Sequence, residues 1–167
     1  MGIVKYAPAL LQFVNFSVHC PMFLFDRLMN PMKCLVVTPE KTVLNLDATF
    51  VVLPLADGEY GILPGHAPLI ARLGAGELRI TGTDGQPTDY YVEGGFVEVL
   101  DDMIALLTMY SVPAADLDLK HAEEQLAKAL ESPSDTQELL NIRHEKVYNQ
   151  RARVRVAQKA AEKMGHR

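Results

Sequence analysis

Cysteine is scarce in this chain of 167 residues, and long apolar runs are missing from it. Cys20 and Cys34 form no CxxC pair, and disulfide scaffolds are usually cysteine-dense, so we interpret both as reduced thiols in a cytosolic-type compartment. The most apolar stretch, residues 7–25, is interrupted by glutamine, asparagine, serine, histidine and proline. Because a membrane-spanning helix needs roughly 20 nearly uninterrupted apolar residues, this stretch is not predicted to span a membrane.

The sequence also lacks the common short motifs of enzymes. It contains no GxxxxGKS or GxxxxGKT phosphate loop, no HExxH zinc motif and no GxSxG nucleophile turn. Its five histidines, at positions 19, 66, 121, 144 and 166, lack the spacing of metal ligands. We therefore expect no catalytic residue, no cofactor and no metal site. An unrelated sandwich enzyme is a weak alternative, because no nucleophile–base pair is visible.

A targeting signal is missing from the N-terminal region, which we treat separately as residues 1–32. A weak basic start is followed neither by a small-residue cleavage site nor by an arginine-rich transit pattern. Regular strand patterning begins only at Lys33, and Met22, Met29 and Met32 are alternative translation starts. We predict that residues 1–32 are an extension without a fold of their own, or an upstream-start artefact. The missing transit pattern favours a bacterial source.

Charge is unevenly distributed along the chain, whose formal charge is −5. Residues 1–133 carry 8 basic and 17 acidic side chains, whereas residues 134–167 carry 8 basic and 4 acidic ones. A general nucleic-acid binder should show a dominant basic surface, so we exclude nucleic acid as a partner. The basic C-terminal segment is instead suited to an acidic partner.

Short strand-like segments occupy residues 33–112. The segments CLVVT, ATFVVLPL, ELRI, TDYYVEG, GFVEVL and MIALLTM are separated by turn sequences such as TGTDGQP, GG and DD. Tyr91 and Glu93 alternate with Tyr90 and Val92, as expected for a half-buried strand. Short strands at this regular spacing predict an antiparallel β-sandwich or barrel.

Residues 113–167 predict an αα-hairpin, which makes the fold class α+β, an N-terminal antiparallel β-sandwich followed by two helices. The stretch AADLDLKHAEEQLAKALE has no glycine, and its apolar residues recur at three- and four-residue steps. Asp116 or Asp118 is expected to cap this helix, and Ser134 with Gln137 forms a capping box for the next. Few helical residues are large and apolar, so the hairpin should be marginally stable alone. It is either a static appendage or a part that detaches to reach another surface.

Residues 57–78, DGEYGILPGHAPLIARLGAGEL, place five glycines and two prolines around a single histidine. Glycine permits unusual backbone angles and proline restricts them, so this composition predicts a specified backbone path. No nucleophile lies near His66 in the sequence, and exposed residues on rigid loops are usually used for binding. We interpret the frame around His66, residues 64–68, as a loop between strands that is used for binding.

Two stretches of this region resemble one protein family. The segment VVTPEKTVLNLDATFVVLPLADGEYGILPGHAPLIARLGAGELRI, followed by YYVEGGFVEVLDDMIALL, resembles the epsilon subunit of the rotary F-type ATP synthase. The resemblance covers about residues 33–162, and GEYGILPGHAPLIARLGAG is its most specific part. It implies a β-sandwich and a helical hairpin, and a non-catalytic role in the central stalk.

The resemblance also implies partners. Epsilon subunits bind the gamma subunit and the ring of c subunits, help to transmit torque to the catalytic head, and can extend the hairpin to inhibit ATP hydrolysis. The turn that meets the c ring matches Asp57, Gly58, Glu59 and Tyr60. The loop near gamma matches His66, Ala67 and Pro68. The basic positions that face the catalytic beta subunit match Arg151, Arg153 and Arg155, which do not share one helix face and are otherwise a solvated charge run.

One departure from the family concerns nucleotides. Some members bind ATP through a helix motif Ile/Leu-Asp-x-x-Arg-Ala, and residues 117–122 match it with His121 in place of the arginine. A mostly neutral imidazole lacks the two-pronged donor geometry of arginine, so ATP sensing is not expected. A free-standing nucleotide-sensing module is the alternative function. The main expectation is a peripheral membrane protein, held through its complex on the cytoplasmic face of a bacterial inner membrane.

Overall fold

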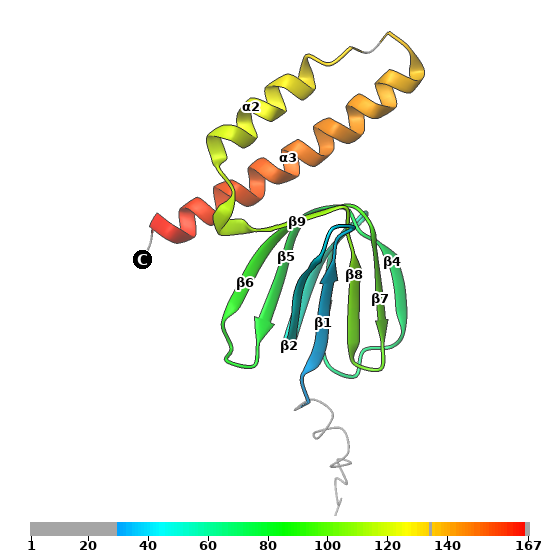
Figure 1. Ribbon diagram of the computed structural model, residues 1–167, viewed down its shortest axis with the longest axis vertical. Helices are drawn as coiled ribbons and strands as arrows, with labels where there is room; N and C mark the ends of the chain where they lie inside the picture. The colour runs from blue at the N-terminus through cyan, green and yellow to red at the C-terminus, as the bar shows by residue number, and fades with distance from the viewer. Residues whose placement is uncertain (1–29, 134, 166–167) are drawn as a thin grey trace, which may run out of the picture.

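The computed structural model describes residues 30–133 and 135–165, in which a strand-rich part is followed by two helices (Figure 1). The strands are β1 (Met32–Val37), β2 (Thr42–Leu55), β3 (Gly58–Ile62), β4 (Leu69–Arg72), β5 (Ala75–Gly82), β6 (Pro87–Glu93), β7 (Phe96–Leu100), β8 (Met103–Leu107) and β9 (Tyr110–Pro113). A short 3-10 helix, η1 (Ala114–Asp116), leads into α2 (Leu119–Leu130) and α3 (Gln137–Gly165). The predicted fold class, a β-sandwich followed by an αα-hairpin, is confirmed.

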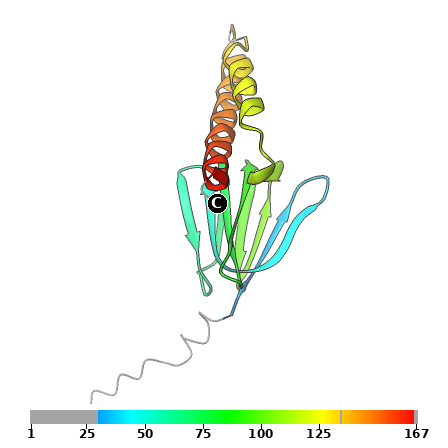
Figure 2. The same cartoon turned by 90° about the vertical axis from the view of Figure 1, so that its left-hand side faces the viewer.

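The strands are hydrogen-bonded in the order β4-β7-β8-β1-β2-β5-β6-β9, and β3 pairs with β2 outside this path. Figures 1 and 2 show that this sheet folds over into two layers. Side chains alternate along each strand, so that Val97 and Val99 of β7 are buried between the layers, whereas Phe96 and Leu100 face outward. The same alternation in the other strands fills the core with valine, leucine and isoleucine.

The strand pattern differs from the predicted one in three respects. β1 pairs with β8 in parallel, so the sandwich is not wholly antiparallel. A parallel pair needs a long crossover, and here the whole chain from β2 to β7 supplies it. β3 and β4 lie inside the glycine-rich segment that composition alone marks as loop, and β9 was also not predicted. β1 begins at Met32, one residue before the predicted boundary, and the remainder of the predicted extension up to residue 29 lies outside the described residues.

Gly95 shows why this fold needs glycine at specific points. Its φ of +109° is unfavourable for L-amino acids, and a Cβ built there would lie 1.9 Å from the carbonyl oxygen of Leu107. The Gly94–Gly95 pair therefore lets β6 turn into β7 directly against the end of β8.

The hairpin begins at a cap that the sequence predicts. The carboxylate of Asp118 accepts hydrogen bonds from the backbone N–H groups of Lys120 and His121, at 2.9 and 3.4 Å. At the start of α3 the N–H of Leu139 donates to Thr136 Oγ1. The predicted cap residue Ser134 lies outside the described residues. No helix among residues 30–133 and 135–165 is long and apolar enough to cross a membrane.

The hairpin stands at one end of the sandwich, with the α2–α3 connection far from the strands (Figure 1). α2 packs mainly on α3, and α3 contacts the sandwich chiefly at β5 and η1, with further contacts from Asn149 to β6. The buried residues at this junction are few and mostly small: Ala75, Tyr91, Ala114, Ala152 and Val156. Because this junction buries little apolar area, it holds α3 on the sandwich only weakly. The sparse apolar stripe of the helices predicts this weak attachment.

Changes at and before Met32 can show where the folded part of the chain begins. Its side chain is fully buried in the sandwich core, so Met32→Ala is expected to lower the free energy of unfolding by about 2–5 kcal/mol. A chain that starts at Pro31 keeps this side chain and should unfold at the same urea concentration as the full chain. Urea unfolding of the three proteins compares them directly. A large loss of stability in the shortened chain would show that residues before Pro31 pack on the fold.

Candidate functional site

Two exposed segments flank β3 at its opposite ends. The first is the end of the β2–β3 hairpin, with Asp57 in the turn and Gly58, Glu59 and Tyr60 as the first residues of β3, all of which are exposed. The connection between β3 and β4, residues 63–68, carries His66, Ala67 and Pro68, and we call it the docking loop. Ala67 and Pro68 are exposed, whereas His66 is half-buried. The resemblance assigns these two segments to two different partners, and the side chains of Tyr60 and His66 connect them.

Tyr60 and His66 join the two segments. The Tyr60 hydroxyl lies 3.1 Å from Nε2 of His66, and the two rings meet edge to face with centroids 5.6 Å apart. The other ring nitrogen, Nδ1, lies 2.6 Å from the carbonyl oxygen of Ala67. A carbonyl oxygen only accepts, so Nδ1 donates to Ala67, and in the tautomer that carries its proton there Nε2 accepts from Tyr60. His66 is therefore a structural element of the loop as well as part of its surface.

An apolar face adjoins the docking loop. β4 continues directly from the loop, and its Ile70 is 75% exposed. On the neighbouring strands Phe96 is 59% exposed and its register partner Leu107 is 56% exposed. The next outward pair along these strands is Glu98 and Ala105, and Leu100 and Met103 form a further exposed apolar pair beyond it. Several large exposed apolar side chains on one sheet face, with a single carboxylate among them, are typical of an interaction surface.

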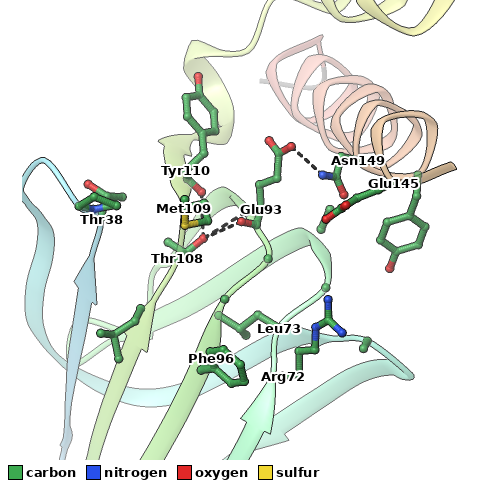
Figure 3. Close-up of a pocket in the computed structure, with 18 of the residues that line it drawn as sticks. Thr38, Arg72, Leu73, Glu93, Phe96, Thr108, Met109, Tyr110, Glu145 and Asn149 are labelled. Carbon is green, nitrogen blue, oxygen red and sulfur yellow. Dashed lines mark hydrogen bonds between the residues drawn. The ribbon is translucent and has the colours of Figure 1, made fainter. Parts of the chain in front are cut away.

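A second functional region is the junction between α3 and the sandwich. The guanidinium of Arg153 lies over the rings of Tyr91 and Tyr110, 5.2 and 4.8 Å from their centroids. It also approaches Glu93 to 3.7 Å, and Asn149 donates to the other oxygen of the same carboxylate at 2.8 Å. Figure 3 shows Glu93 and Asn149 facing each other between the sandwich and α3.

Tyr91 contributes a backbone contact to the same junction. Its hydroxyl donates to the carbonyl oxygen of Asn149 at 3.0 Å. Burial raises the pKa of Tyr91 well above its usual value, so the hydroxyl keeps its proton and remains a donor. The alternation predicted for this strand placed Tyr91 and Val92 on opposite faces. Both are fully buried, because α3 covers one face and the sandwich core the other.

A cluster of charges fastens the end of α3. The side chain of Glu77 on β5 is only 6% exposed, and it binds Arg79 at 2.7 Å and Lys159 at 2.9 Å. Lys163 lies 3.5 Å from Glu77 and also pairs with Asp89. Burial by itself would raise the pKa of Glu77, but hydrogen bonds from Lys159 and Arg79 outweigh it and lower the pKa from 4.5 to about 2. The carboxylate is therefore charged at neutral pH and ties α3 to β5.

The three predicted arginine positions on α3 have different surroundings. Arg151 and Arg155 are exposed. Arg153 points to the sandwich, where its side chain is 17% exposed. The expectation that they do not share one helix face agrees with this placement.

Sequence reasoning did not identify Glu77, Glu93, Asn149, Lys159 or Lys163 as attachment points. The nearest signal was the basic character of the C-terminal segment, which indicates an acidic partner without identifying it.

A cleft of about 1140 Å³ separates the sandwich from the N-terminal half of α3. Figure 3 shows its lining, in which Thr108 bonds to the backbone of Glu93 and Arg72 rises from the opposite side. Its rim includes Phe96 and Leu107, so the cleft opens onto the apolar face. Among the described residues no group of three or more histidine, cysteine or acidic side chains could hold a metal ion. Burial raises the pKa of Cys34 to about 12, which makes this free thiol unreactive.

Comparisons with known proteins agree with this arrangement. A family model described as the β-sandwich domain of the ATP synthase delta/epsilon chain matches residues 31–114. An ATP synthase epsilon chain from Rhodopirellula baltica is 44% identical over 126 residues, which cover 75% of this chain and 98% of the relative. An ATP synthase epsilon chain from Granulibacter bethesdensis is 42% identical over 95 residues, covering 56% of this chain and 70% of the relative.

Solved structures show the same fold at lower identity. A chain of the Euglena gracilis mitochondrial ATP synthase, in a structure of its OSCP/F1/c-ring, matches with a TM-score of 0.67 and 20% identity. The match covers 80% of this chain and 82% of that chain. A chain of the central stalk and c-ring of the Tetrahymena thermophila enzyme matches with a TM-score of 0.58 and 20% identity, covering 78% of this chain and 96% of that chain.

Proposed function

The chain belongs to the ATP synthase delta/epsilon family, and from this membership we propose that it is a non-catalytic subunit of the central stalk of an ATP synthase. It couples the rotation of the c ring and the gamma subunit to ATP synthesis. The observation that carries the proposal is the exposed apolar face of Ile70, Phe96 and Leu107 beside the docking loop. Exposure of apolar side chains to water is unfavourable, and a permanent partner that covers them removes this exposure.

Two contacts with the rotor follow from this proposal. The end of the β2–β3 hairpin, with Asp57, Gly58, Glu59 and Tyr60, meets the c ring. The docking loop, with His66, Ala67 and Pro68, meets gamma, and the apolar face extends the same contact. The hydrogen bond between Tyr60 and His66 supports this assignment, because it links the first part of β3 to the docking loop. The complex then lies at the surface of a membrane, which we propose is the cytoplasmic face of a bacterial inner membrane.

The hairpin has a regulatory role in this proposal. Its α3 attaches through a small apolar junction and two polar clusters, an arrangement that can open without unfolding the sandwich. Arg151 and Arg155 are exposed in the docked hairpin, and Arg153 becomes accessible once α3 leaves. The three arginines then reach an acidic surface of the catalytic beta subunit and inhibit ATP hydrolysis. A free-standing nucleotide sensor gains no support from the exposed His121 at the start of α2.

The rotor contacts are tested by charge changes in these two segments. Glu59→Arg and His66→Asp are expected to weaken binding to a gamma–c-ring complex by about fivefold to tenfold, which corresponds to roughly 1–1.4 kcal/mol. Glu59 is an exposed residue of β3, so thermal unfolding of the free protein should shift little in Glu59→Arg. Binding is measured by surface plasmon resonance on immobilised complex that lacks its own epsilon subunit.

Glu123→Arg on α2 is the matched control for Glu59→Arg, since Glu123 is also exposed and lies on a helix that packs on α3 and outside the proposed rotor contacts. It should bind as the unchanged protein does. Unchanged binding by both Glu59→Arg and His66→Asp would remove the support for a rotor contact at this surface.

A further inference from the structure

The docking loop is fixed from outside by a residue that sequence reasoning did not single out. The backbone N–H of Gly65 donates to Oδ1 of Asp102 at 2.5 Å, although the two residues are 37 positions apart. Gly65 has a φ of +78°, in the left-handed region that favours glycine. Tyr60 holds His66 from the β3 side, and Asp102 holds Gly65 from the β7–β8 turn. The loop is thus anchored on both sides.

The turn that supplies Asp102 has an unusual backbone. Asp101 and Asp102 have φ values of +49° and +59°, and they are the non-glycine residues with positive φ among the described ones. This left-handed region is disfavoured for residues with a Cβ, and two-residue hairpin turns of this type prefer asparagine and glycine. Glycine at either position would form the turn more readily. An aspartate at position 102 therefore has a use that the turn itself does not explain.

We infer that Asp102 is a positioning residue for the docking loop: its carboxylate, held at the β7–β8 turn, keeps the backbone around Gly65 and His66 in the shape that meets the rotor. The inference rests on the proposed function, since that function makes the loop a contact surface. The main chain of Asp102 is fixed independently, because its carbonyl oxygen accepts a hydrogen bond from the N–H of Lys33 at 2.8 Å. The backbone position of Asp102 therefore does not depend on the hydrogen bond that its side chain accepts from Gly65.

The physical reason is preorganisation. A loop that is ordered before binding loses less conformational freedom when it meets its partner, so the complex is tighter without any new contact. The carboxylate also forms a charge-assisted hydrogen bond, which is stronger than one between neutral groups. Losing this anchor is expected to loosen the loop in the free protein and to weaken binding to the rotor by about fivefold, as for other preorganising contacts.

Three substitutions separate the anchor from the strain of the turn. Asp102→Gly relieves the backbone and removes the acceptor. Asp101→Gly relieves the neighbouring residue in the same turn and leaves the acceptor in place, so it is the matched control. Asp102→Asn tolerates positive φ and keeps a side-chain oxygen that can accept from Gly65, so it is the conservative rescue. All three are made in the full chain.

Two measurements are needed, one without a partner and one with it. Amide hydrogen exchange of Gly65, followed by NMR in the free protein, should accelerate at least about tenfold in Asp102→Gly and stay unchanged in the other two, because only that variant frees the N–H. Binding to the immobilised gamma–c-ring complex should weaken about fivefold in Asp102→Gly alone. Thermal unfolding should occur at the same or a higher temperature in both glycine variants, since each relieves strain.

Binding therefore weakens in Asp102→Gly without a loss of thermal stability, a combination that a purely structural role would not produce. Equal exchange and equal binding in Asp102→Gly and Asp101→Gly would overturn the inference. So would a fall in the unfolding temperature of Asp102→Gly that Asp102→Asn fails to restore, because Asp102 would then stabilise the whole domain. Faster exchange of Gly65 together with unchanged binding in both Asp102→Gly and His66→Asp would leave the anchor in place but refute the rotor contact.

Discussion

Ending the chain after Leu117 is expected to raise the ATP hydrolysis rate of the assembled synthase by at least about tenfold while synthesis stays coupled. The estimate follows from the inhibitory contact: charge-assisted hydrogen bonds contribute about 1.5–3 kcal/mol each, and 1.4 kcal/mol is already a factor of ten. The cut keeps the sandwich whole, because β9 pairs with β6 as far as Pro113 and the N–H of Leu117 donates to Ala114.

Salt and two pairs of variants identify the origin of the inhibition. Attraction between exposed charges is screened within about 8–10 Å at ordinary ionic strength, so the full-length complex should hydrolyse ATP faster as salt is added. Arg151→Ala with Arg155→Ala should raise hydrolysis at low salt, since both side chains are exposed and available to the head. Lys128→Ala with Lys146→Ala removes the same charge from other exposed positions of the hairpin and is the control. Equal hydrolysis by the full and shortened chains at both salt concentrations would make the hairpin a passive appendage.

Periodicity predicted the sandwich because most of its strands have one buried and one exposed face. Buried and exposed residues alternate regularly in β7 and β8, and their sequences show the matching alternation of apolar and other residues. β3 and β4 escaped prediction because four or five residues among glycines and prolines have too little pattern to register. Pairing with β2 and β7 makes them strands, and such long-range pairing is not written in local composition.

Some residues of the candidate site could be predicted from the sequence, whereas others could not. Loop residues such as His66 were found because an uncommon composition marks them. Asp102 and Glu77 were missed, since each looks like an ordinary surface acid in the sequence. Their roles depend on partners 37 and 82 positions away, Gly65 and Lys159, and these meet only once the chain has folded.

Acidification is expected to release α3 from the sandwich, and Glu77 sets the pH range. The pKa of this carboxyl is lowered from 4.5 to about 2 in the docked hairpin. Its contribution is therefore complete above about pH 4.5 and disappears as the pH falls toward 2. Part of this lowering comes from Arg79, which lies on β5 with Glu77 and stays there after release, so only the share due to Lys159 favours docking. We therefore expect about a tenfold change in the ratio of docked to released hairpin.

Glu77→Gln should mimic the acidic state at neutral pH. It removes the charge that holds Lys159 and Lys163, and both lysines are about half exposed, so they can turn to water. The variant should show more released hairpin at pH 7 and little further change between pH 4.5 and 2. Glu98→Gln is a matched control, because Glu98 is an exposed strand carboxylate outside the junction.

Pulsed electron resonance between labels at Thr83→Cys and Gln158→Cys measures the release as a lengthening of the distance from the β5–β6 turn to α3. Both positions are exposed, whereas Cys34 is buried and unreactive, so only Cys20 has to be replaced by serine. A distance distribution that stays the same from pH 7 to pH 2, or a Glu77→Gln variant as firmly docked as the unchanged protein, would contradict an electrostatic attachment. The small apolar junction of Ala75, Ala152 and Val156 would then have to hold α3 by itself. That is the outcome its limited buried area argues against.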